Sequence, residues 1–331
     1  MKSLTLKRML LLTCILITLP LLSVGCGKGN NEALTSINIG YFNNITHAQA
    51  LLMKSEKSLE QTLGAEVTVN WTAFNAGPAE VEALFSGAVD IGYIGPVPAI
   101  TANVKSKGDV QILSGATKGG AVLIKQKDSD IKALEDLSGK TVAIPQIGNT
   151  QHLCLLQLLS EHGLSPVTDN GTVTVSAVAN ADVANTMERG DIDAALVPEP
   201  WGATLLANGA ELLLDYDQIY MDGAYDVAVV VIRKEFLQKY PEAAEAFLKE
   251  HELATKQINE HPEESLTAIN EELNAATGKS LDPVILADAF TRIGVSSELN
   301  RDSIYGFAEV SKEQGFIDSL PDKDLYVSTK S

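Results

Sequence analysis

The chain has 331 residues, 45% of them hydrophobic, and a formal net charge of −18 at pH 7. This length is sufficient for two lobes of ordinary domain size. The excess of acidic residues argues against nucleic acid or anionic lipid as a partner. An anionic ligand would therefore have to be attracted by local features of its binding site.

The first 25 residues predict a secretory signal. Lys2, Lys7 and Arg8 precede an apolar run over residues 9–22. This run is shorter than a membrane span of about 20 residues and is typical of the apolar region of a signal peptide.

The signal ends in Leu22-Ser23-Val24-Gly25-Cys26, which resembles the lipobox of bacterial lipoproteins. It departs from that pattern because the large aliphatic residue lies four positions before Cys26 instead of three. We expect cleavage after residue 25, acylation of Cys26, and a flexible tether over residues 26–35. A soluble secreted protein cleaved nearby is the alternative.

After the tether, short apolar runs alternate with amphipathic segments, which is typical of an α/β fold with mostly parallel sheets. The predicted strands are 36–42, 67–74, 90–94, 110–117, 121–125, 141–145, 172–179, 194–198, 211–215 and 227–233. The predicted helices between them are 47–63, 78–86, 96–105, 131–137, 150–162, 181–189 and 200–208. The unbroken β-branched run at 227–233 indicates a strand buried on both faces. From residue 235 onward the chain is mainly helical, with amphipathic segments 242–259 and 263–274 and helix starts at Asp282 and Asn300.

Small and polar residues follow six of the predicted strands. The six segments are Asn43-Asn44-Ile45-Thr46-His47, Asn75-Ala76-Gly77, Gly95-Pro96-Val97-Pro98, Lys118-Gly119-Gly120, Gln146-Ile147-Gly148-Asn149-Thr150-Gln151-His152 and Glu199-Pro200-Trp201. In open α/β sheets, ligands bind beyond the carboxyl ends of the strands, where free N–H groups at helix starts favour an anion. Any one segment can be explained as a helix cap or turn, so the prediction of a cleft depends on the combination.

Five strings, in this order, resemble the substrate-binding proteins of nitrate/sulfonate/taurine-type ABC importers: IGYFNNITHAQA, FNAGPAEVEALFSGAVDIGYIGPVPAI, GATKGGAVL, GNTQH and PEPWGATLL. The resemblance implies the type II periplasmic-binding-protein fold, with two α/β lobes, a double-crossover hinge and a helical C-terminal part. Lobe 1 would comprise residues 36–125 and 221–331, and lobe 2 residues 126–220.

The same resemblance implies the function. The protein would be an extracytoplasmic lipoprotein, held at the cell membrane by its lipid anchor alone, and a monomer. It would capture a small polar anion or zwitterion by lobe closure and deliver it to an ABC permease and its ATPase.

The resemblance places the ligand contacts in the loops that follow the strands. The expected contacts are Asn43, Thr46, His47, Gly95, Val97, Lys118, Gly119, Asn149, Thr150, Gln151, His152, Glu199 and Trp201. A carboxylate at Glu199 would suit an ammonium group and so favours a zwitterion such as an amino-sulfonate; alternatively, Glu199 caps its own helix or bonds across the hinge. Trp201 either stacks on the ligand or is a core aromatic residue.

Two other functions stay open. Relatives on this scaffold carry thiamine precursors, riboflavin or other small heterocycles, so a heterocycle is the alternative ligand. A cofactor-precursor enzyme is a more remote alternative, because no recognisable nucleophile motif accompanies His47, His152 and Glu199. No cofactor is expected, and no metal either, because five scattered histidines form no metal-binding set.

Overall fold

The structure is a computed structural model that describes residues 33–278 and 280–328. The predicted signal segment and the acylation site at Cys26 lie outside these residues, as does most of the tether. Within the described ranges, no helix has the length and apolar character needed to cross a membrane.

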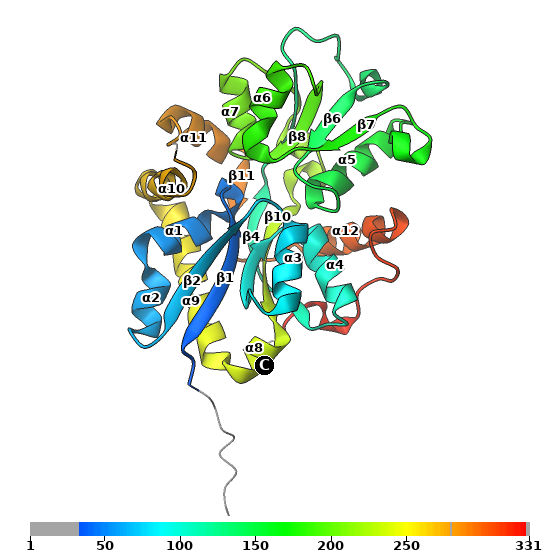
Figure 1. Cartoon of the computed structure of the whole chain (residues 1–331). Helices are drawn as coiled ribbons and strands as arrows, with labels where there is room; N and C mark the ends of the chain where they lie inside the picture. The colour runs from blue at the N-terminus through cyan, green and yellow to red at the C-terminus, as the bar shows by residue number, and fades with distance from the viewer. Residues whose placement is uncertain (1–32, 279, 329–331) are drawn as a thin grey trace, which may run out of the picture. The chain divides into compact units, whose positions relative to one another are not determined.

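Two sheets organise the fold (Figure 1). The six-stranded sheet has the order β11-β4-β10-β3-β1-β2 and consists of β1 (Ser36–Phe42), β2 (Thr68–Phe74), β3 (Ile91–Ile94), β4 (Val110–Gly119), β10 (Asp226–Arg233) and β11 (Ile293–Val295). The five-stranded sheet has the order β7-β6-β8-β5-β9 and consists of β5 (Ala121–Lys125), β6 (Thr141–Ile144), β7 (Thr174–Ala177), β8 (Ala194–Pro198) and β9 (Glu211–Leu214).

The chain passes between the sheets twice, first between β4 and β5 and again between β9 and β10. The first passage runs through Gly119 and Gly120, which both adopt positive φ (68° and 75°), a conformation that glycine allows at little cost. Segment 121–125 was expected in the first part of lobe 1, but it pairs with β8 and β9 instead. The lobe boundary that we propose therefore moves to Gly119–Gly120.

The sheets are mixed, which corrects the expectation of mostly parallel pairing. Parallel ladders join β1 to β2 and β3, and β6 to β7 and β8. The strands next to the two passages run the other way: β10 is antiparallel to β3 and β4, and β5 is antiparallel to β8 and β9. These strands enter from the other sheet and not through a helical crossover, so nothing requires them to be parallel.

Twelve α-helices cover the sheets in the described part of the chain. They are α1 (Ala48–Glu56), α2 (Ser58–Leu63), α3 (Gly77–Ser86), α4 (Pro96–Lys105), α5 (Thr150–Glu161), α6 (Val183–Glu188), α7 (Trp201–Ala207), α8 (Lys234–Lys239), α9 (Pro241–Glu260), α10 (Pro262–Thr277), α11 (Pro283–Phe290) and α12 (Arg301–Glu313). The helix expected over 47–63 is divided at Lys57, which has a φ of 54°. Asp282 and Asn300 cap α11 and α12, so both predicted helix starts are confirmed. Helix α8 falls in the part that was predicted only as mainly helical, and strand β11 was not predicted.

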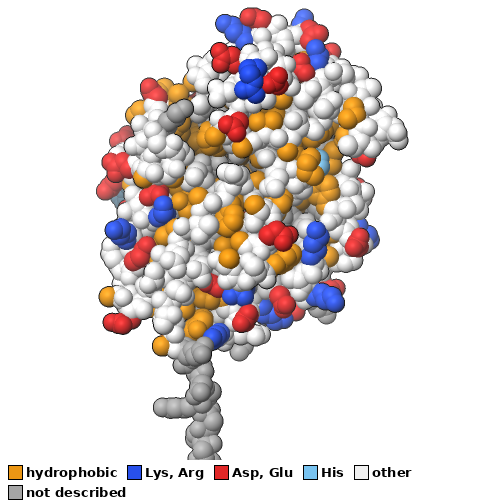
Figure 2. Space-filling model, in the orientation of Figure 1, with side chains coloured by type: hydrophobic (Ala, Val, Ile, Leu, Met, Phe, Trp, Pro, Cys, Tyr) orange, Lys and Arg blue, Asp and Glu red, His pale blue; other side chains and the backbone are white. Residues whose placement is uncertain are grey.

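Strand β10 is buried along almost its whole length, as the β-branched run predicted. Strands β3 and β4 pair with its two edges, and helix α4 packs against it. On the face drawn in Figure 2, hydrophobic side chains gather over the middle, while most charged side chains lie toward the edges. The carboxyl ends of β1, β3, β6 and β8 meet at one place, since Phe42, Gly95, Pro145 and Pro198, at or next to these ends, line the same pocket.

Candidate functional site

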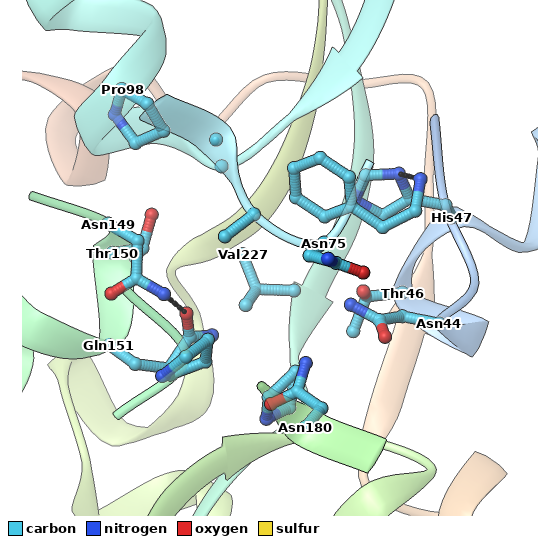
Figure 3. A pocket seen from close by; sticks show the side chains of 16 residues that line it. Asn44, Thr46, His47, Asn75, Pro98, Asn149, Thr150, Gln151, Asn180 and Val227 are labelled. Atoms are coloured by element: carbon cyan, nitrogen blue, oxygen red, sulfur yellow. Dashed lines mark hydrogen bonds between the residues drawn. The ribbon is translucent and has the colours of Figure 1, made fainter. Parts of the chain in front are cut away.

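A small pocket, called here the polar pocket, lies where the ends of these strands meet the starts of several helices (Figure 3). It is lined by Phe42, Asn44, Thr46, His47, Asn75, Ala76, Gly77, Gly95, Pro98, Pro145, Asn149, Thr150, Gln151, Asn180, Pro198 and Val227. No Asp, Glu, Lys or Arg is among these lining residues. The free volume is about 20 Å³, which is room for about one water molecule. A larger ligand can enter only when the walls separate.

Helix starts supply the electrostatics of the polar pocket. Helices α3, α4 and α5 begin at Gly77, Pro96 and Thr150, each of which lines the pocket or adjoins a lining residue. The first N–H groups of a helix lack intrahelical acceptors, and the helix dipole makes this end positive. At α4 both prolines lack an N–H and the Val97 N–H is bonded to Thr150, so the free N–H groups come from α3 and α5. The dipoles of all three ends favour an anion without a charged side chain.

Asn149 shapes the start of α5. Its Oδ1 accepts the N–H of His152 at 2.8 Å, and its Nδ2 donates to Oε1 of Gln151 at 3.0 Å. Asn149 is therefore the N-cap of the helix, and it also fixes the Gln151 amide, which lies on the opposite side of the pocket from His47 in Figure 3. The backbone amides of Thr150 and Gln151 are the ones that a ligand can engage.

His47 faces the polar pocket as a neutral donor. Its Nδ1 accepts the N–H of Phe42 at 3.1 Å, and the two rings stack with centroids 4.4 Å apart. Burial lowers the pKa of His47 to about 3, so near neutral pH the ring is uncharged. Because Nδ1 is an acceptor, the single proton lies on Nε2. The hydroxyl of Thr46 lies beside it in the pocket lining.

Two hydrogen bonds connect residues that follow strands of one sheet to residues that follow strands of the other. The indole Nε1 of Trp201 donates to Oδ1 of Asn44 at 2.7 Å. Thr150 Oγ1 lies 3.4 Å from the backbone nitrogen of Val97 and accepts its N–H. A Cβ at Gly95 would lie 2.4 Å from the same hydroxyl oxygen, so this approach requires glycine. Val97 thus contributes through Thr150 and does not line the pocket itself.

Glu199 does not line the polar pocket, and both of its carboxylate oxygens contact other residues. Its Oε2 accepts the N–H of Ala203 at 2.9 Å, and its Oε1 lies 3.3 Å from Nη1 of Arg292. Glu199 therefore accepts an N–H from the first turn of its own helix and also contacts Arg292, next to β11, as the two structural alternatives proposed. Burial raises the pKa of Glu199 to about 7, against the opposing effects of Ala203 and Arg292. The ammonium acceptor expected for a zwitterion does not line this pocket.

Three other expected contacts also lie elsewhere. His152 points away: its Nδ1 accepts the N–H of Gly148 at 3.1 Å and its ring stacks on Phe316, with centroids 5.2 Å apart. Burial lowers the pKa of His152 to about 4. Lys118 and Gly119 are paired within the six-stranded sheet, opposite β10 and β11. Of the thirteen expected contacts, the polar pocket brings together Thr46, His47, Gly95, Asn149, Thr150 and Gln151.

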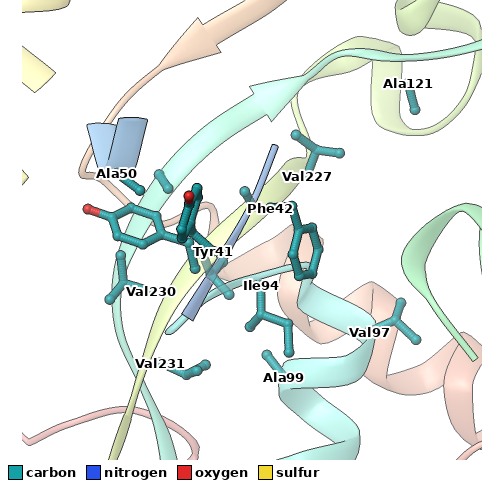
Figure 4. Packing of buried hydrophobic residues seen from close by; sticks show 14 of the residues in the cluster. Tyr41, Phe42, Ala50, Ile94, Val97, Ala99, Ala121, Val227, Val230 and Val231 are labelled. Atoms are coloured by element: carbon teal, nitrogen blue, oxygen red, sulfur yellow. The ribbon is translucent and has the colours of Figure 1, made fainter. Parts of the chain in front are cut away.

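Some lining residues were not among the expected contacts. Asn180 opens a short 3₁₀ helix, Asn180–Asp182, after β7. Asn180 directly follows the predicted strand 172–179, so it belongs to the same kind of strand-end segment as the expected contacts. Phe42 and Val227 belong to the hydrophobic cluster drawn in Figure 4 and reach the pocket from the ends of β1 and β10. Nothing in the sequence separates them from the other core residues.

Side chains that bind metal ions do not cluster in the described part of the chain. Within residues 33–278 and 280–328, no group of three or more His, Cys, Asp or Glu side chains lies close enough together to hold a metal ion.

Two sheets joined by two chain passages, with a pocket at the strand ends between them, define a periplasmic-binding-protein fold. The alkanesulfonate-binding protein SsuA from Xanthomonas axonopodis pv. citri, bound to MOPS, is similar, with a TM-score of 0.75 at 20% identity over 90% of this chain and 100% of that chain. The predicted fold class is thereby confirmed. The chain belongs to the NMT1-like family, whose model matches residues 30–270.

Two curated relatives come from Escherichia coli (strain K12). The taurine-binding periplasmic protein is 33% identical over 201 residues, which is 60% of each chain. A putative aliphatic sulfonates-binding protein is 32% identical over 180 residues, which is 54% of each chain. This chain therefore matches a little more than half the length of these relatives.

Proposed function

We propose that the protein is an extracytoplasmic solute-binding protein of an ABC importer and that its polar pocket binds the anionic group of a sulfonate. The observation that carries this proposal is the lining itself, in which neutral donors and three helix starts surround a space that no charged side chain enters. The names of the two E. coli relatives support the same ligand class.

The donors suit a singly charged group with several oxygens. Nε2 of His47, the Thr46 and Thr150 hydroxyls and the backbone amides of α5 can each bond one oxygen. A hydrogen bond to a charged group contributes about 1.5–3 kcal/mol, and micromolar affinity requires about −8 kcal/mol. Four or five such contacts offset the cost of closing the walls. An arginine clamp is not needed.

Transport follows from the same proposal. The N-terminal segment would direct secretion and anchor the chain through Cys26, and the two sheets would belong to two lobes that close on the ligand. Separation of the walls admits the ligand, and the closed form is the one that a permease and its ATPase would recognise. In this role the protein is a monomer and carries out no catalysis.

A binding screen tests the proposed function. The purified protein is heated with methanesulfonate, taurine, nitrate, a thiamine precursor or riboflavin, and any shift in melting temperature is followed up by calorimetry. We expect at least one sulfonate to stabilise the protein with micromolar affinity, and Thr150→Val to weaken that binding about tenfold. Stabilisation by a heterocycle alone would show that the pocket serves the alternative ligand class.

A further inference from the structure

A second cavity, called here the tail cavity, adjoins the polar pocket. Its volume is about 350 Å³, and its lining includes Asn43, Asn180, Trp201, Leu205, Leu273 and Leu281. These residues come from the segment after β1, the region of α6, helix α7, and α10 with the segment that follows it. A cavity of about 150 Å³ can hold a benzene molecule, so the tail cavity has room for a ring-sized group.

Two features place the cavities next to each other. Asn180 lines both of them. The hydrogen bond from Trp201 to Asn44 connects a residue of the tail cavity to a residue of the polar pocket. The indole therefore lies at the boundary, where it can contact a molecule that extends from one cavity into the other.

The lining of the tail cavity selects an uncharged group. No Asp, Glu, Lys, Arg or His is among the described lining residues. Leu205 and Leu273 are buried, and Trp201 and Leu281 are partly buried, so the cavity offers an apolar wall. A ligand ammonium would lose its hydration there without gaining a carboxylate, and burial of an unpaired charge is costly.

Two amides add hydrogen-bonding capacity to this wall. The Oδ1 atoms of Asn43 and Asn180 are buried and have no hydrogen-bond partner among the described residues. Buried polar atoms are normally paired, so these oxygens suit a neutral hydroxyl or N–H group on the bound molecule. As uncharged acceptors they do not replace the carboxylate that a buried ammonium requires. The cavity therefore accepts a neutral ring or chain that carries a polar substituent, as well as a purely apolar one.

We propose that the tail cavity receives the uncharged organic end of a sulfonate whose anionic end lies in the polar pocket. The ligand class is then a monoanionic sulfonate with a ring-sized neutral substituent, and not a zwitterion such as taurine. This inference rests on the proposed function, because it takes the polar pocket as the site of the anionic group.

Calorimetry with methanesulfonate, taurine and benzenesulfonate tests the inference on the purified protein. We expect benzenesulfonate to bind at least about tenfold more tightly than either small ligand, because its ring is buried against Trp201 and the leucines. Asn208→Trp places an indole into the cavity from an exposed position. It should remove this preference and leave methanesulfonate affinity within about twofold.

Ala207→Trp is the matched control, because Ala207 is exposed on the same helix and does not line the cavity. It should leave both affinities unchanged. Ala184→Trp fills the cavity from α6 and serves as a second variant should Asn208→Trp fold poorly.

The outcomes separate the two proposals. If the small sulfonates bind and neither a tail preference nor an effect of the two filling variants is seen, the tail cavity is not part of the site and the proposed function stands. If taurine binds more tightly than benzenesulfonate, the assignment to an uncharged substituent is wrong. If no sulfonate binds at all, both proposals fail.

Discussion

The guanidinium of Arg292 lies 3.3 Å from the carboxylate of Glu199, which has no exposed surface. Glu199 follows β8 in the five-stranded sheet, and Arg292 immediately precedes β11 in the six-stranded sheet. The ion pair therefore connects the two halves of the fold. Arg292 also lies 2.8 Å from Asp288 and 3.4 Å from Asp215. One guanidinium is shared among three carboxylates, and burial still raises the pKa of Glu199 to about 7.

Glu199→Gln should remove a pH dependence of stability. The pKa of Glu199 rises from an ordinary value of 4.5 to about 7 on folding. Between these values the folded state holds more protons than the unfolded state, so the free energy of unfolding falls as the pH rises. From pH 4.5 to pH 8, the wild type should lose about 3 kcal/mol relative to Glu199→Gln. Urea unfolding of both proteins across this range measures the difference.

Comparison of the two proteins isolates this one group. Asp226, whose pKa burial raises to about 6, titrates in the same range, but it is present in both and cancels. Glu188→Gln, at an exposed position, controls for the loss of one negative charge. Parallel pH profiles for the wild type and Glu199→Gln would mean that Glu199 is ionised throughout and that Arg292 fully compensates its burial.

The elements of the fold were largely predictable because burial in an α/β sheet leaves a local signature. The apolar runs identified β1, β5 and β8 with their observed bounds, and the Pro96 start identified α4. The shift of 121–125 to the other sheet was not predictable, because a strand's composition shows that it is buried and not which sheet it joins. The antiparallel direction of β5 and β10 was not predictable for the same reason, because composition does not show the direction in which a buried strand runs.

The candidate site was predictable as a set of loops and not as a set of side chains. His47 and His152 both lie close to a strand end and a helix start, yet only His47 lines the polar pocket. The difference comes from tertiary contacts, since the ring of His152 packs on Phe316, far along the chain. Glu199 likewise finds its partner 93 residues later, at Arg292. Such long-range pairing leaves no local pattern to detect.

Replacement of His47 by Asn and by Gln should separate its two roles. Asn can place Oδ1 near the position of Nδ1 and keep the bond to the Phe42 N–H, whereas Gln can place an amide near the position of Nε2. We expect His47→Asn to fold well and to bind a sulfonate about tenfold more weakly. His47→Gln should bind more tightly than His47→Asn but lose about 1–3 kcal/mol of stability, because the buried Phe42 N–H loses its acceptor.

Calorimetry and urea unfolding on the two variants check this prediction. Because burial lowers the pKa of His47 to about 3, its charge does not change between pH 5 and pH 8, so its contribution to sulfonate affinity should be constant over that range. Equal affinities for the two variants would mean that Nε2 does not contact the ligand.

Gly95→Ala should prevent closure of the walls. The new Cβ would lie 2.4 Å from Thr150 Oγ1, whereas the φ of −66° at Gly95 is one that alanine adopts freely. If closure brings these residues together, Gly95→Ala should weaken sulfonate binding about tenfold or more and alter stability little.

A double-mutant cycle with Thr150→Ala identifies the cause. Thr150→Ala removes the hydroxyl that the new Cβ would meet, so Gly95→Ala should cost much less affinity in that background than in the wild type. Strictly additive losses would show that the two residues do not meet in the bound form.

Glu80→Gln should become more stable relative to the wild type as the pH rises. Glu80 is fully buried on α3, and both carboxylate oxygens lack a hydrogen-bond partner in the described part of the chain. They occupy a hollow formed by Gly40 and Gly92, which pair across β1 and β3; a Cβ on either glycine would approach Oε1 to 2.2 Å or less. Burial raises the pKa of Glu80 well above its ordinary value, so the folded state holds this carboxyl in its neutral form.

The unfolded state ionises Glu80 above its ordinary pKa of 4.5, so the free energy of unfolding falls as the pH rises above that value. Glutamine has nearly the same shape and no proton to lose. Urea unfolding should therefore show the stability of Glu80→Gln relative to the wild type rising steadily from pH 4.5 to pH 8, because only the wild type must lose a proton on unfolding. The gain from Glu199→Gln should instead level off above pH 7, because that carboxyl ionises in the folded state. A gain for Glu80→Gln that is the same at pH 4.5 and pH 8 would mean that Glu80 does not change its protonation on unfolding.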